Sequence, residues 1–312
     1  MTRVSRRDFM ALTAGAAALG ACGGRGLLAA DANAGAQMSI ARWTGGKDLK
    51  PEEIRQAAVR LTEKAIEAIG GMKRFVSAGS VVWVKPNIAW DRKPELAANT
   101  NPDVVATIVR LCLAAGAKKV KVGDNPCHAA QKTYASSGIA DAAKEAGAEV
   151  VFLDKSRFKD MAINGEKIKT LPVYPEIIET DLVINVPVVK HHVLAKTTIC
   201  MKNYMGVIEK RNTLHQDLGT CIADLTRFMK PRLCVMDAVR ILTARGPTGG
   251  NPADVKLTMT VAAGTDIVAL DALGAEIMGL KPADIPSIVK GEQYGLGKMD
   301  YKALSPVEMA VS

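Results

Sequence analysis

Short apolar runs alternate with amphipathic stretches along most of this chain. The apolar runs predict strands near residues 81–84, 118–122, 149–153, 182–189, 233–236 and 257–262. Helical spacing of apolar residues predicts helices near 51–69, 102–115, 137–146, 217–229, 266–278 and 285–292. Nearly continuous apolar strands that alternate with helices are typical of an α/β fold, with a mainly parallel sheet covered by helices on both faces. We therefore predict a single large α/β domain over residues 35–312, with active-site loops at the carboxyl ends of the strands.

The signals at the helix ends support these boundaries. Asn101 is a good cap residue, and Pro102 suits the first helical position that follows it. Asp266 is expected to cap the helix that ends near Met278. No strand is expected in the glycine-rich lead-in over residues 34–50 or in the irregular stretch that ends at Pro175.

The stretch over residues 182–206 holds the densest group of chemically useful side chains. An apolar strand is followed by Lys190, His191, His192, Lys196, Lys202 and Asn203. In an open α/β sheet, the loops beyond the carboxyl ends of the strands form the ligand crevice. We expect this cluster to form a loop at that crevice, and the alternative is a solvated basic loop.

Other polar residues also fall at predicted strand ends: Lys85, Asn87, Asp124, Asn125, Asp237 and Arg240. Several loops that meet at one edge of a sheet can build a single active site. Gly249 and Gly250, in a turn-rich loop, could offer backbone N–H groups to an anion, although a plain flexible loop explains them as well. Asp271 could face either a site or solvent.

Composition and charge narrow the class of ligand. The chain has 41 basic and 32 acidic residues, a formal net charge of +9, and no dense basic run. Aromatic residues make up 4% of the chain, which argues against a stacking surface for single-stranded nucleic acid. We predict a small anionic molecule as partner, and no nucleic acid.

Residues 1–34 are expected to be a targeting segment. The run from Ser5 to Met10 resembles a twin-arginine export signal, and an apolar stretch too short to span a bilayer follows it. The segment ends either at a lipoprotein box with Cys22 or at an A-x-A cleavage site near Ala34. We therefore expect an exported protein, periplasmic or lipid-anchored, that meets a membrane only through its signal or anchor.

The six cysteines follow no metal-binding pattern. No C-x-x-C is present, and no spacing matches a zinc or iron–sulfur site. Cys112, Cys221 and Cys234 lie in apolar patterns and are predicted to be core residues. Cys127 and Cys200 lie in or beside candidate site loops, so a role as soft ligands stays open.

Several motifs together resemble the family called domain of unknown function 362. They are V-K-P-N at 84–87, T-N-P at 100–102, G-D at 123–124, V-V-K-H-H at 188–192, T-T-I-C-M-K-N-Y-M-G at 197–206, G-P-T-G-G at 246–250 and G-T-D-I-V-A-L-D at 264–271. They occur in the family's order over residues 80–297. Many relatives carry an additional ferredoxin-type cluster domain with cysteine runs, which this sequence lacks.

A second resemblance suggests a chemistry. The spacing of His192, Lys202 and His215 is similar to that in the nickel-pincer lactate racemase group. That resemblance implies Lys202 as the covalent carrier of a pincer nucleotide, His215 as a nickel ligand, and His192 as an acid/base at a hydroxy acid. The glycine-rich segment that precedes the lysine in the racemases is replaced here by Thr-Ile-Cys-Met. Otherwise Lys202 and Asn203 would bind a phosphate or carboxylate, or brace the loop.

Two functions follow from this reasoning. The first is an exported enzyme of unassigned reaction that depends on a metal or another cofactor and acts on a small anionic substrate. The second is a non-catalytic exported protein that binds an anionic small molecule. For the enzyme, the expected catalytic residues are Lys85, Asp124, His191 and His192, the cofactor-binding residues are Lys202, Asn203, Gly249 and Gly250, and the metal ligands are His215 and His192.

Overall fold

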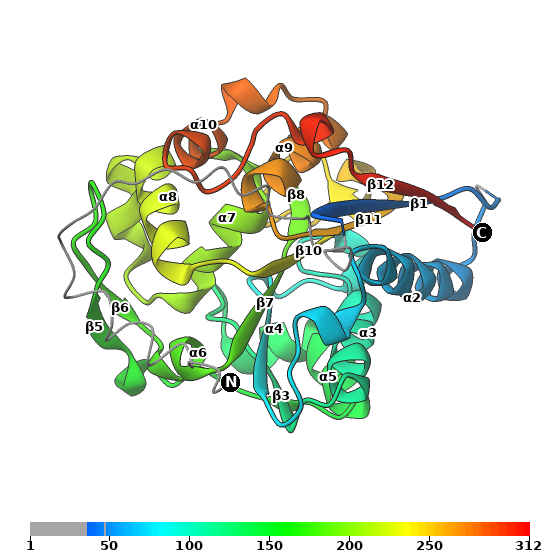
Figure 1. The fold of residues 1–312 in the computed structure, drawn as a ribbon, viewed down its shortest axis with the longest axis horizontal. Helices are drawn as coiled ribbons and strands as arrows, with labels where there is room; N and C mark the ends of the chain where they lie inside the picture. The colour runs from blue at the N-terminus through cyan, green and yellow to red at the C-terminus, as the bar shows by residue number, and fades with distance from the viewer. Residues whose placement is uncertain (1–35, 47) are drawn as a thin grey trace, which may run out of the picture.

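A ten-stranded sheet runs through the molecule (Figure 1). The computed structural model describes residues 36–46 and 48–312, so the predicted targeting segment with Cys22 lies outside the described residues. The strands are β1 Met38–Trp43, β2 Val81–Pro86, β3 Lys119–Val122, β4 Glu149–Val150, β7 Leu182–Val186, β8 Val188–His192, β9 Lys196–Thr198, β10 Leu233–Leu242, β11 Val255–Gly264 and β12 Val307–Val311. The main path is β12-β1-β11-β10-β7-β2-β3-β4, and β8 joins it beside β10 with β9 as its second neighbour.

The sheet is mainly parallel, as predicted. β10, β7, β2, β3 and β4 pair in parallel, whereas β11 runs antiparallel to both β10 and β1. β12 closes the other edge in parallel with β1. A separate antiparallel hairpin pairs β5 Lys159–Ala162 with β6 Thr170–Val173.

Helices cover both faces of the sheet, which also confirms the prediction. The helices are α2 Pro51–Ala68, α3 Pro102–Ala114, α4 Ala130–Ser136, α5 Ile139–Glu145, α6 Pro175–Glu179, α7 Cys200–Asn203, α8 Leu218–Met229, α9 Ile267–Ile277 and α10 Pro286–Gln293. Figure 1 shows α8, α9 and α10 on one side and α2, α3 and α5 on the other. Because side chains of a strand alternate between faces, Trp83 enters the core under the first group, and Val82 and Val84 enter the core under the second.

The apolar run at 182–189 forms two strands, not the single one predicted. Pro187 separates β7 from β8, since proline lacks the N–H that a strand interior needs. β7 lies between β2 and the start of β10, and β8 continues beside the later part of β10 while its other edge pairs with β9. Lys190, His191 and His192 therefore lie in a strand, and their predicted position in a loop is wrong.

Several further boundaries differ from the prediction. β1 lies in the supposed lead-in, β5 and β6 lie in the stretch predicted to be irregular, and α4 and β12 were not predicted. β10 extends to Leu242, so Asp237 and Arg240 lie inside a strand and not at its end. Among the described residues, no helix has the length and apolar character needed to cross a membrane.

Candidate functional site

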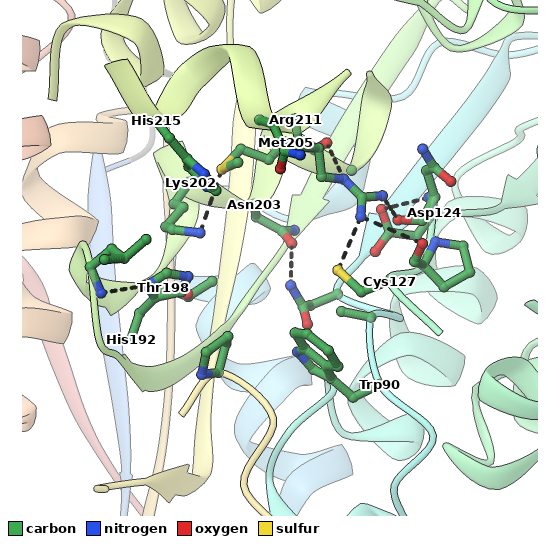
Figure 2. Close-up of a pocket in the computed structure, with 18 of the residues that line it drawn as sticks. Trp90, Asp124, Cys127, His192, Thr198, Lys202, Asn203, Met205, Arg211 and His215 are labelled. Carbon is green, nitrogen blue, oxygen red and sulfur yellow. Dashed lines mark hydrogen bonds between the residues drawn. The ribbon is translucent and has the colours of Figure 1, made fainter. Parts of the chain in front are cut away.

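A cavity of about 860 Å³ opens beyond the carboxyl ends of β2 and β3 and beside the β8–β9 hairpin. Its walls come from the segments after β2 and β3, from the hairpin, and from the region that follows α7. Figure 2 shows Lys202 between His215 and the His192 hairpin, with Asp124 and Cys127 across the cavity. The crevice is where an α/β sheet is expected to hold a ligand.

A buried ion pair forms the floor of this cavity. Lys85 Nζ lies 2.7 Å from Asp124 Oδ1, and the two side chains are 0% and 2% exposed. Burial lowers the pKa of Lys85, while the Asp124 carboxylate opposes that shift. Asp124 Oδ2 also accepts a hydrogen bond of 2.7 Å from the backbone N–H of Ile88, which fixes the carboxylate at the end of β2.

Gly206 allows the chain to pass directly against this ion pair. A Cβ atom at this position would lie 1.7 Å from Asp124 Oδ1 and 2.7 Å from Lys85 Nζ. Only glycine therefore fits here while the ion pair keeps its geometry. The backbone carbonyl of Gly206 accepts a hydrogen bond from Asn125 N at 3.0 Å, which joins this segment to the end of β3.

Amide side chains connect the floor to a second buried lysine. Lys190 Nζ donates to Asn87 Oδ1 at 2.9 Å and to the carbonyl of Ala98. Asn87 Nδ2 in turn donates to Asn203 Oδ1 at 3.0 Å, and that oxygen also accepts from Lys85 at 3.2 Å. Burial, together with the nearby Lys202 charge, lowers the pKa of Lys190 to about 7. Lys190 therefore carries only part of a positive charge at neutral pH.

Lys202 brings an amine to the cavity wall. It is partly buried in α7, and its Nζ donates to the thioether of Met205 at 3.5 Å, which is a weak acceptor. In the described chain no carboxylate lies within ion-pair distance of Lys202 or Lys190. Burial lowers the pKa of Lys202 to about 8, so it is mostly protonated at neutral pH and is within reach of deprotonation.

His192 enters the cavity as a neutral ring. Burial and the positive charge of Lys202 lower its pKa to about 3. His192 Nδ1 accepts hydrogen bonds from Leu194 N at 3.1 Å and Ala195 N at 3.2 Å. The ring therefore carries its hydrogen on Nε2, where it can donate to a ligand.

Arg211 is a site residue that was not predicted from the sequence. It begins η5 (Arg211–Gln216), and its guanidinium donates to Cys127 Sγ at 3.0 Å, to Met205 O at 3.1 Å and to the carbonyl of Asn125. These bonds hold the segment after α7 against the loop after β3. The sequence offered no signal for Arg211 beyond its charge, because its position depends on folded loops that are far apart in sequence.

The structure gathers most of the predicted site residues, but not all of them. Those that line the cavity are Asn87, Asp124, His192, Lys202, Asn203 and His215. Lys85 does not line it, but lies buried behind Asp124 as the partner in the ion pair. His191 does not line the cavity, since its Nδ1 accepts a hydrogen bond of 3.1 Å from Gly246 N. Gly249 and Gly250 do not line it either: a Cβ atom at Gly249 would contact the Leu242 side chain, and one at Gly250 would contact the Arg92 side chain.

Two buried aspartates have structural roles. Asp237 accepts hydrogen bonds from Asn101 N at 2.8 Å and Val239 N at 3.0 Å. Asp271, predicted to face a site or solvent, faces neither: it is buried in α9, and its carboxylate accepts a hydrogen bond of 2.6 Å from Cys200 N at the start of α7. Asp266 caps α9 as predicted, accepting from Ala269 N at 2.8 Å.

The cysteines divide as the apolar pattern predicted. Cys112, Cys221 and Cys234 are buried. Cys200 is buried too, whereas Cys127 is exposed and lines the cavity. Of the two candidate soft ligands, only Cys127 is therefore placed to meet a ligand.

The described residues do not form a metal centre by themselves. No group of three or more His, Cys, Asp or Glu side chains in the described chain could hold an ion. The residues of the pincer scheme, His192, Lys202 and His215, do line one cavity. Their placement is therefore compatible with Lys202 as carrier and one imidazole as ligand, with a bound pincer nucleotide supplying the redox chemistry.

This site and fold define an α/β protein with a cation-rich crevice at the strand ends. The family model described as domain of unknown function (DUF362) matches residues 82–276, which is more than half of the chain. The chain belongs to this family, as the motifs in the sequence indicated. It is also similar to thylakoid-associated protein sll1697 of Synechocystis sp. (strain ATCC 27184 / PCC 6803 / Kazusa), with 28% identity over 241 residues, 74% of this chain and 73% of that protein.

Proposed function

We propose that this protein is an enzyme that binds a small anionic substrate in the cavity and moves a proton on it. The observation that carries the proposal is the pair Lys190 and Lys202, two amines without a carboxylate partner in the described chain that line one cavity. Five basic residues line the cavity, against two acidic ones. One of those two, Asp124, already neutralises Lys85. The remaining positive charge favours a carboxylate or phosphate ligand.

The neighbouring groups supply acid/base chemistry. A general base works best when its pKa lies near the operating pH, and the pKa of Lys190 is lowered to about 7. His192 is neutral and presents an N–H group that can donate to an oxygen on the substrate. In this scheme Lys202 and Arg211 hold the anionic group, Lys190 accepts a proton from the substrate, and His192 stabilises the charge that develops on oxygen.

We further propose that the chain acts after export by the twin-arginine pathway, either in the periplasm or anchored by a lipid. The relative named as thylakoid-associated is consistent with a position close to a membrane. A reporter fusion to residues 1–34 tests this part. Export that is lost when the pair Arg6 and Arg7 is replaced by lysine supports it, and a reporter that stays in the cytoplasm contradicts it.

The alternative is a protein that binds the anion without catalysis. This alternative is favoured by the polar side chains at the floor of the cavity, which already have hydrogen-bond partners within the protein. Lys85 and Asn203 have their partners inside the protein, so they can shape a pocket without reacting. Proton exchange with solvent separates the two functions. The protein is incubated in D₂O with hydroxy acids and phosphorylated hydroxy acids, and the loss of substrate C–H signals is followed by NMR.

The enzyme reading predicts exchange that is lost in Lys202→Met. Lys73→Met is the matched control, because Lys73 is an exposed lysine in η1 (Met72–Arg74), before the amino end of β2. Anion binding without exchange would support the carrier. If no anion binds, neither function stands.

A further inference from the structure

The turn between β8 and β9 places two exposed apolar side chains at the edge of the cavity. Val193 is 71% exposed and Leu194 is 63% exposed, whereas the other exposed large apolar residues of the described chain reach at most 43%. Neither side chain joins one of the two hydrophobic cores. Both line the cavity that Lys202 and His192 also line. An apolar contact surface at a ligand pocket commonly meets an apolar part of the ligand.

The turn is held in a fixed relation to the charged part of the cavity. His192 Nδ1 accepts hydrogen bonds from the N–H groups of Leu194 and Ala195, at 3.1 Å and 3.2 Å. The His192 ring, which lines the cavity with Lys202, therefore also holds the backbone of the apolar turn in place. A ligand that spans both regions would meet a surface that is already organised, which lowers the entropic cost of binding.

The size of the cavity supports a ligand larger than a simple anion. Its volume of 860 Å³ is in the upper part of the range of about 300–1,000 Å³ that holds drug-sized ligands. An acetate or phosphate ion would fill a small part of it. Further apolar surface in the wall comes from Trp90, Met205 and Pro247.

We propose that the ligand is an anionic amphiphile, with its carboxylate or phosphate at Lys202 and its hydrocarbon chain along Val193 and Leu194. This inference rests on the proposed function, since it extends the ligand of the same site. Each methylene that the apolar wall buries should then raise affinity about fourfold. The charged end alone should set the affinity for the shortest anion.

The test is a titration series with straight-chain carboxylates: acetate, butyrate, hexanoate and octanoate, followed by calorimetry. Three proteins are compared: the wild type, Val193→Ser/Leu194→Ser, and the control Leu257→Ser/Val307→Ser. The control replaces the same residue types at exposed positions of β11 and β12 that do not line the cavity. Serine is compatible with a turn, so the hairpin should keep its fold.

Affinity should rise with chain length in the wild type and in the control. In Val193→Ser/Leu194→Ser it should become nearly independent of chain length, while acetate binds as in the wild type. Equal affinities for acetate and octanoate in the wild type would overturn the inference and leave the proposed function standing. An unchanged slope in the variant would overturn the role of the turn, and failure of every carboxylate to bind would overturn both proposals.

Sedimentation velocity on the same proteins tests the competing occupant of this surface, a second copy of the chain. The inference expects the same sedimentation coefficient for the wild type and for Val193→Ser/Leu194→Ser. A wild type that dimerises and a variant that does not would assign the turn to self-association and overturn the inference.

Discussion

Replacing Asp124 with asparagine should destabilise the protein far more than a similar change at the surface. The substitution leaves Lys85 buried without a counter-charge at the floor of the cavity. At an effective dielectric constant of about 20, two unit charges 2.7 Å apart attract by about 6 kcal/mol. Part of this is offset by desolvation, and breaking one side of a buried pair costs about 3–5 kcal/mol. We expect Asp124→Asn to lower the free energy of unfolding by that amount.

The measurement is urea unfolding followed by circular dichroism at neutral pH. Glu308→Gln is the matched control, because Glu308 forms an exposed pair with Arg42, and such pairs contribute about 0–1 kcal/mol. Lys85→Met/Asp124→Asn should recover much of the stability, since it removes both buried charges. If the free energy of unfolding of Asp124→Asn lies within about 1 kcal/mol of the wild-type value, Lys85 and Asp124 do not form the buried ion pair described.

Three further predictions concern neighbouring features. Gly206→Ala should disrupt the ion pair and lower the thermal midpoint, because the added Cβ overlaps Asp124 Oδ1; a midpoint equal to that of the wild type would refute the close approach. Burial raises the pKa of Asp271 to about 7. The folded state therefore binds this proton more tightly than the unfolded state does. As a result, the contribution of Asp271 to the free energy of unfolding falls as pH rises from about 4 to about 7. Asp271→Asn should therefore show a shallower loss of stability over that range in urea unfolding, and an unchanged pH profile would contradict the shift. Iodoacetamide should label Cys127 first among the described cysteines, as the exposed one, and a bound anion should slow the labelling seen by peptide mass spectrometry; equal rates with and without anion would place the ligand elsewhere.

The local parts of the fold could be predicted from the sequence. Asn101 Oδ1 accepts from Asp103 N at 2.9 Å, so the cap signal before α3 corresponds to a real hydrogen bond. The apolar runs and the helical spacing of apolar residues predicted the mainly parallel sheet and the helices on both of its faces. These patterns could be found in the sequence because they involve residues that are close together in the chain. β1 and β12 were missed because their partners are far away in the sequence: β12 pairs with β1, and β1 pairs with β11.

The predicted residues of the candidate site came from strand ends, from the segment that follows residue 189, and from the spacing of His192, Lys202 and His215. Lys85 and Asp124 end neighbouring parallel strands, so the sequence could bring them together. The position of Arg211 at the cavity depends on how the segments after β3 and α7 pack against each other. The position of His191 outside the cavity depends on its contact with Gly246. No local sequence pattern encodes either contact. The residues predicted as a loop after Val189 belong to β8, which pairs with β10 on one side and β9 on the other, and Lys190 lies buried in it.

The central claim is that protonated Lys202 binds an anion in this cavity. The direct measurement is calorimetric titration of wild type and Lys202→Met with acetate and with inorganic phosphate, between about pH 6 and about pH 9.5. An anion favours the protonated amine, so wild-type affinity should fall about 30-fold as pH rises through the pKa of Lys202 near 8, with proton uptake on binding in that range. Lys202→Met should bind more weakly and lose most of this dependence. Wild-type affinity that stays constant across the range, or equal binding by Lys202→Met, would contradict the claim.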